Sequence, residues 1–139
     1  MEEWTRWQPT QGLSGKYYLE SLTWSEQGVI ILLSDESNSQ KIEIIFKDFV
    51  DAYRCTNESF YFLLFSDLSK QYGTDFYKDW SFFKVQNSKY IQWLSIKSAT
   101  WADQFSFIHF SIFGGNEIID IVARYEPTVS ISPGKHSLL

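Results

Sequence analysis

The chain has 139 residues, and its 17 acidic and 12 basic side chains give a formal net charge of −5. Proteins that bind nucleic acid carry basic patches, whereas Lys and Arg are scattered singly here, which argues against nucleic acid as a partner. The acidic balance favours a partner protein with a basic surface. Cys55 is the only cysteine, which excludes an intramolecular disulfide and a multi-cysteine zinc site, and we interpret it as a small buried hydrophobe.

The chain begins with MEEWTRWQPT, which has two acidic residues where a secretory signal needs basic ones. Its longest apolar runs, VIILL and FYFLLF, are far shorter than a membrane span. We therefore expect a cytoplasmic protein that has no membrane partner. The length suits a single domain, which we place at residues 16–131. Residues 1–15 are predicted to be a leader that packs on this domain through Trp4 and Trp7. Residues 132–139 are predicted to be a flexible tail.

Strand patterns dominate the first half of this domain. The run GVIILLS is apolar on both faces, as expected of a covered central strand. In the following KIEIIFKD, apolar and charged side chains alternate, which is typical of a half-exposed strand. The predicted strands are residues 16–24, 28–34, 41–48 and 49–55, the last either separate or a bulged extension of the strand before it.

The apolar spacing changes after Asn57. Between Tyr61 and Tyr72 apolar residues recur every three or four positions, with Thr56 or Asn57 placed to cap a helix and Gly73 placed to end it. The apolar middle of this segment also fits a buried strand. Helix and strand therefore both stay open for this part of the chain.

A second short helix is predicted over residues 87–98, NSKYIQWLSIKS, with its Asn or Ser as N-cap. The chain then forms a hairpin, in which QFSFIHFSIF and EIIDIVARYE flank the turn GGN at residues 114–116. Strands in runs with helices inserted between them indicate an α+β fold. We expect a single domain with a mainly antiparallel sheet of about six strands and two short helices.

His109 lies inside the first strand of this hairpin, with apolar side chains on both strand faces. Hydrogen bonds can satisfy a buried histidine, because burial disfavours its charged form. A catalytic role would need a carboxylate or nucleophile aimed at the ring. Asp120 on the next strand is the candidate, although the sequence does not fix the register. We predict a core histidine and rank an enzyme using His109 and Asp120 lowest.

No other stretch carries a catalytic, cofactor or metal signature. GLSGK at residues 12–16 has two residues between its glycines where a phosphate-binding loop needs four, so a turn is favoured. The acidic residues around Asp75 and Asp79 lack a third ligand at matching spacing. We therefore expect no enzymatic activity, no cofactor and no metal site.

Tryptophans beside the predicted helices are candidates for a binding surface, because Trp is enriched in interfaces and stacks on sugars. We predict that Trp93 packs its helix onto the sheet. Packing and exposure fit Trp101 equally well, because small and polar residues flank it.

Several stretches together resemble a group of small uncharacterised acidic proteins of Gram-positive bacteria. They are WQP near the start, KYYLES, AYR, WSFFKVQNSKYIQWL, and IHFSIF followed by IIDIVARYEPTVS, spread over most of the chain. The resemblance implies an immunity protein encoded near a secreted polymorphic toxin. It carries over no functional residue.

We therefore expect a non-enzymatic intracellular protein that binds another protein, in the leading case a toxin with a basic surface. The predicted partner-binding surface combines Trp101, Asp103, Asp120, Arg124 and Glu126. The aromatic content of 19% supports an alternative, a small-ligand or carbohydrate-binding module with an apolar pocket or an exposed row of rings.

Overall fold

The computed structural model describes residues 1–135, with nine strands, three α-helices and two 3₁₀ helices in that range. In chain order these elements are β1 (Glu3–Arg6), β2 (Tyr17–Ser25), β3 (Gly28–Asp35), β4 (Gln40–Phe46), β5 (Ala52–Asn57), η1 (Glu58–Tyr61), α1 (Phe62–Tyr72), α2 (Asp75–Lys78), β6 (Phe82–Gln86), α3 (Lys89–Lys97), η2 (Trp101–Gln104), β7 (Ile108–Phe113), β8 (Glu117–Ala123) and β9 (Thr128–Pro133). No helix of this part of the chain is both long and apolar enough to cross a membrane.

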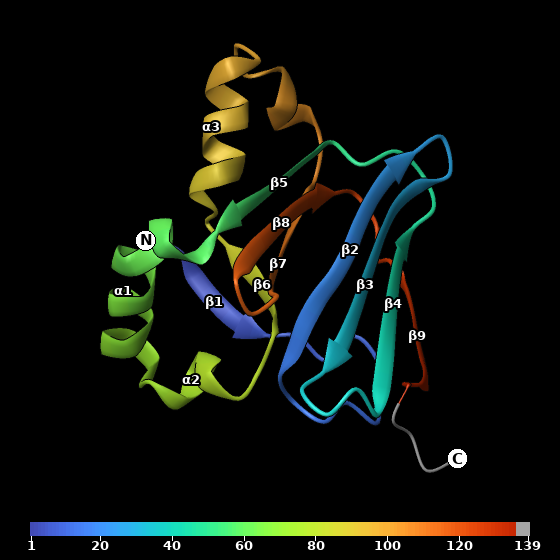
Figure 1. Cartoon of the computed structure of the whole chain (residues 1–139). Helices are drawn as coiled ribbons and strands as arrows, with labels where there is room; N and C mark the ends of the chain where they lie inside the picture. The colour runs from blue at the N-terminus through green and yellow to red at the C-terminus, as the bar shows by residue number, and fades with distance from the viewer. Residues whose placement is uncertain (136–139) are drawn as a thin grey trace.

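The strands form two antiparallel sheets (Figure 1). One has five strands in the order β1-β6-β7-β8-β5, and the other has four in the order β2-β3-β4-β9. The predicted α+β class with antiparallel pairing is confirmed, while the prediction of one sheet with about six strands is wrong. The period of apolar residues shows that a segment is extended and which side chains share a face, but it does not show which strands pair.

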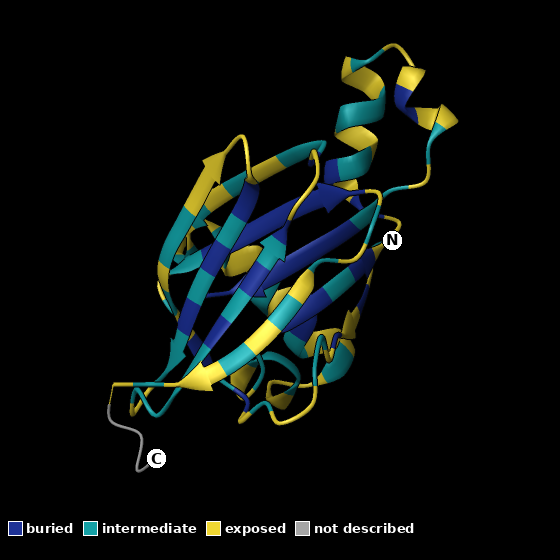
Figure 2. Ribbon diagram, turned by 90° about the vertical axis from the view of Figure 1, so that its right-hand side faces the viewer, coloured by how far each residue is buried: buried dark blue, intermediate teal, exposed yellow. Residues whose placement is uncertain are grey.

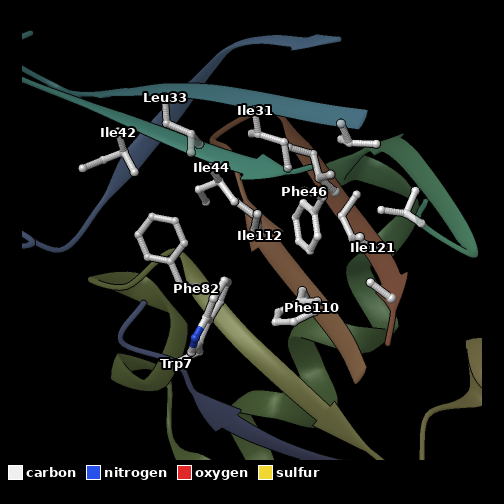
Figure 3. Packing of buried hydrophobic residues seen from close by; sticks show 14 of the residues in the cluster. Trp7, Ile31, Leu33, Ile42, Ile44, Phe46, Phe82, Phe110, Ile112 and Ile121 are labelled. Atoms are coloured by element: carbon white, nitrogen blue, oxygen red, sulfur yellow. The ribbon is translucent and has the colours of Figure 1, made fainter. Parts of the chain in front are cut away.

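The main core lies between the two sheets (Figure 3). Side chains of β3 and β4 point toward those of β6, β7 and β8, and the rings of Phe46 and Phe110 meet edge to face with centroids 5.3 Å apart. Trp7, which follows β1, lies against Phe110 at 4.9 Å. The predicted central strand is β3, whose Val29, Ile31 and Leu33 are fully buried.

The other face of the five-stranded sheet is covered by α1 and α2. Leu68 of α1 packs in a second cluster with Trp4, Phe83 and Phe113. The segment after Asn57, for which helix and strand both stayed open, is therefore helical. The side chains that it packs on the sheet are the ones whose spacing indicated a helix, between Tyr61 and Tyr72. Asn57 caps η1 rather than α1, because its side chain accepts a hydrogen bond from the Ser59 backbone N–H.

Both predicted terminal segments contain strands. Residues 3–6 of the predicted leader are β1, which pairs with β6 at the edge of the five-stranded sheet, with Trp4 opposite Val85. In the predicted tail, Ser132 and Pro133 belong to β9, which pairs with β4. Residues 136–139 of that tail lie outside the described residues.

The predicted closing hairpin is present as β7 and β8. Gly115 adopts φ +88° in the turn, a conformation that favours glycine, and Gly114 accepts a hydrogen bond from Leu19 of β2. One prediction nearby is wrong, because Cys55 is exposed rather than buried. It lies on β5, which is an edge strand of its sheet.

Residues 88–105, which include α3 and η2, stand away from both sheets (Figures 1 and 2). We call this segment the arm. The main contacts of α3 are with η2, and the buried side chains of these two helices are Tyr90 and Ala102. Most of the arm is therefore surface, as the yellow and teal colouring in Figure 2 shows.

Candidate functional site

His109 lies in the middle of the five-stranded sheet, on the face toward the helices. Its side chain is 2% exposed, so the predicted burial is confirmed. The register places Asp120 of β8 opposite Ser111 and Arg54 of β5 opposite Asp120. Because side chains alternate across a strand, His109, Asp120 and Arg54 share one face of three neighbouring strands.

A chain of hydrogen bonds runs through this face. His109 Nε2 lies 2.7 Å from Asp120 Oδ1, and His109 Nδ1 lies 2.7 Å from the hydroxyl of Ser88. An ionised carboxylate only accepts, so Nε2 donates its proton to Asp120. The Ser88 oxygen also accepts from the Ile91 backbone N–H at 3.1 Å, which makes Ser88 the N-cap of α3. One serine thus joins the arm to the sheet.

Asp120 is the centre of this network. Its other oxygen accepts from Arg54 Nε at 2.9 Å and from the Tyr61 hydroxyl at 3.3 Å. Burial acts to raise the pKa of Asp120, but the hydrogen bond and electrostatic attraction of His109, followed by those of Arg54, outweigh it, so the pKa lies below its usual value. The carboxylate is therefore ionised although it is 2% exposed.

The arrangement contains the groups of a Ser-His-Asp triad, and its chemistry depends on access. A hollow of about 280 Å³ reaches the network, because His109 and Asp120 line it together with Trp4, Arg54 and Lys89. A serine nucleophile needs an oxygen that a substrate can reach, and its base needs room to pass the proton on. Both nitrogens of His109 and the oxygen of Ser88 are engaged inside the protein, and both residues are buried. In this arrangement the network cross-links β5, β7, β8 and α3.

The structure brings together three of the five residues predicted to bind a partner. Trp101 packs on Phe105 with centroids 4.8 Å apart, and the Arg124 guanidinium lies 3.8 Å from the centroid of the same Phe105 ring. Asp103 lies two residues beyond Trp101 in η2 and accepts a hydrogen bond from Ser95. These contacts place Trp101 and Arg124 on the same Phe105 ring, at the C-terminal end of the arm, and Asp103 against α3 within it.

The other two residues lie elsewhere. Asp120 is buried beneath the helices with His109, and Glu126 forms an ion pair with Lys84 of β6. Asp120 lies on one face of β8, and the surroundings of Arg124 differ from those of Asp120. The helices cover the middle of that face, while Arg124 follows the end of β8 and is exposed.

Two further features were missed from the sequence. Trp93 is 51% exposed on α3, so the prediction that it packs the helix onto the sheet is wrong. The helix faces the sheet with Tyr90 instead, and leaves Trp93, Ile96 and nearby Trp101 toward solvent, the last two 78% and 55% exposed. The local spacing of apolar residues could not tell which of them the sheet would cover.

The second missed feature is a hollow of about 580 Å³ between the β2–β3 turn and the connection from β4 to β5. Trp24 and Phe49 line it with rings that are 62% and 76% exposed. Glu26 and Asp48 also line it. The sequence signal that could have found it is a tryptophan directly beside the turn residues SEQG.

No protein-family model, no curated protein and no solved structure matches the chain.

Proposed function

We propose that this protein is a non-enzymatic binding protein that blocks a cognate toxin-like protein, and that the arm is its docking surface. The observation that carries the proposal is the group of exposed apolar side chains on the arm, Trp93, Ile96 and Trp101. Contiguous exposed apolar surface marks interaction sites. Tryptophan is the residue most enriched among those that dominate binding energy.

The base of the arm is well held, which supports this role. Ser88 is bonded to His109, and Tyr90 lies between the His109 ring, at 5.8 Å, and the Arg54 guanidinium, at 3.9 Å. A surface that is ordered before binding loses less conformational entropy when the partner docks. The buried network thus contributes to binding by orienting the arm, without a chemical step.

The class of partner follows from charge and from the resemblance. A net charge of −5 favours encounter with a basic protein at low salt. The resemblance to immunity proteins of toxin loci supports a toxin as that partner.

Co-expression with the product of a neighbouring toxin gene tests the proposal. The double variant Trp93→Ala with Ile96→Ala should lose the complex and its protective effect while the melting temperature stays within a few degrees. Phe62→Ala with Leu63→Ala is the matched control, because both of these side chains are exposed and apolar on α1. If the control variant loses the complex and the arm variant keeps it, the arm is not the docking surface.

A small-ligand or carbohydrate-binding module is the second candidate function, and the hollow beside Trp24 and Phe49 is the observation that favours it. A ligand stabilises the folded state in proportion to the logarithm of its concentration above the Kd. A thermal-shift series with neutral oligosaccharides should then raise the melting temperature of the wild type but not of Trp24→Ala. An unchanged melting temperature for the wild type counts against this candidate.

A further inference from the structure

The hollow beside Trp24 combines two kinds of group that bind cations. Its rings are Trp24 and Phe49, and its charged side chains are the carboxylates of Glu26 and Asp48 and the ammonium of Lys47. Within residues 1–135 neither carboxylate takes part in an ion pair. The hollow therefore has a net negative charge, exposed aromatic faces and no cation of this chain bound to its carboxylates.

The chain itself shows what such a combination of groups binds. Arg124 lies over the Phe105 ring at 3.8 Å, and its guanidinium is bonded to Asp51 at 2.9 Å. Arg54 lies over the Tyr90 ring at 3.9 Å and is bonded to Asp120 at 2.9 Å.

In both places an aromatic face and a carboxylate hold one guanidinium between them. A planar guanidinium can stack on a ring and hydrogen-bond a carboxylate at the same time. Trp24, Phe49, Glu26 and Asp48 all line the hollow, and among the described residues no cation lies over either ring or pairs with either carboxylate.

We propose that this hollow receives an arginine side chain of a basic partner protein. The guanidinium would stack on the indole of Trp24, which is the aromatic side chain that binds cations best. Its N–H groups would donate to the carboxylates of Glu26 and Asp48. This inference rests on the proposed function for the identity of the partner, and the recognition of the guanidinium itself rests on the hollow alone.

The hollow is linked to the arm by contacts of the protein. Val50, which lines the hollow, is followed by Asp51, which binds Arg124. Arg124 in turn lies on Phe105, and Phe105 packs on Trp101. These contacts join the hollow to the arm, and the proposal places both under one partner.

The test uses the full chain and small probes in place of a partner. N-acetyl-argininamide is titrated into ¹⁵N-labelled protein, and the indole N–H resonance of Trp24 is identified by its loss in Trp24→Phe. We expect a saturable shift of that resonance with the arginine probe. The neutral isostere N-acetyl-citrullinamide should bind about tenfold more weakly, because it lacks the cation.

Glu26→Gln together with Asp48→Asn should weaken binding of the arginine probe about tenfold. Glu36→Gln, an exposed carboxylate in another turn, is the control and should leave it unchanged. Equal binding of both probes, or no shift of the Trp24 resonance, overturns the proposal. A shift with chitotetraose in place of the arginine probe also overturns it, because the hollow would then be a carbohydrate site.

These results separate the two proposals. If the wild type binds the arginine probe but the arm variant still captures the toxin, only the proposal that the arm is the docking surface is contradicted. If the arm variant loses the complex but the wild type does not bind the arginine probe, only the inference about the hollow is contradicted.

Discussion

At the scale of single residues, the buried side chains of His109 and Asp120 carry the clearest energetic consequences. Each is bonded to partners from other elements, so removal of either leaves its partners with one hydrogen bond fewer. An unsatisfied buried polar group costs more than the net value of a typical hydrogen bond. The stability of this region is therefore sensitive to changes that keep its volume but remove its polarity.

His109→Ala should lower the free energy of unfolding by about 1–3 kcal/mol, because Asp120 and Ser88 each lose a partner. Urea unfolding followed by tryptophan fluorescence measures the change. His109→Gln should recover part of the loss, since its amide can still donate to Asp120. A loss below about 0.5 kcal/mol for His109→Ala would show that the network contributes little to stability.

Asp120 predicts a pH dependence of stability. The folded-state pKa is lowered below the unfolded value of about 3.9, so the carboxylate stabilises the fold fully above that pH. The contribution is lost as the pH falls through the folded-state pKa. The difference in unfolding free energy between the wild type and Asp120→Asn should therefore be largest near pH 6 and shrink below pH 4.

Urea titrations from pH 2 to pH 7 measure this difference. Asp67→Asn is the control, because Asp67 is exposed, and it should stay within about 0.5 kcal/mol of the wild type throughout. A constant difference between the wild type and Asp120→Asn over the whole range would contradict the lowered pKa.

At the scale of elements, α3 depends on Ser88 for both its N-terminus and its attachment. The residue was predicted as one of two possible N-caps, and the structure confirms that it is the cap. Its bond to His109, 21 positions away, was not visible in the sequence. The orientation of the arm thus depends on a side chain that local reasoning assigns only to helix capping.

Ser88→Ala should destabilise α3 by about 0.5–2 kcal/mol, the range for loss of an N-cap side chain. Amides of residues 91–97 should exchange faster with deuterium, while those of β7 and β8 should change little. Ser95→Ala is the control, because its hydroxyl bonds Asp103 and does not cap the helix. Equal exchange of α3 in both variants would show that Ser88 does not hold the arm.

At the scale of the whole molecule, the two sheets share one core, and this determines how the chain unfolds. Phe110 of the five-stranded sheet contacts Phe46 of the four-stranded sheet and also Trp7 from the N-terminal segment. Neither sheet can keep its buried face covered if the other unfolds. We expect a single cooperative transition for the described residues.

Phe110→Ala should lower the free energy of unfolding by about 3–5 kcal/mol, the usual loss for a buried Phe, and keep one transition. Phe60→Ala is the matched control, because Phe60 is 81% exposed on η1, and it should change stability by less than about 0.5 kcal/mol. Calorimetry checks both values. Two separate transitions would show that the sheets unfold independently.

Several features followed from local sequence. The GGN turn predicted the β7–β8 hairpin, because a glycine adopts positive φ there. Helical spacing predicted the covered face of α1, and the apolar run around Ile31 predicted a central strand. These features depend on residues that are neighbours in the chain, and periodicity reports them.

The candidate sites were predicted less well. Burial of His109 followed from its apolar strand, but the bonds to Asp120 and Ser88 depend on strand register and on where α3 begins. Trp93 and Cys55 were expected inside and lie outside, because α3 stands off the sheet and β5 lies at an edge.

By itself the sequence determined the α+β class, most strand positions, the position of α3 and the burial of His109, because each depends on the chemistry of neighbouring residues. The tertiary structure alone decided the partition of nine strands between two sheets, the network around Asp120, the exposed arm and the hollow beside Trp24. Each of these features joins segments that are distant in the chain. The free energy that favours such an arrangement comes from packing between those segments, which a local sequence pattern does not show.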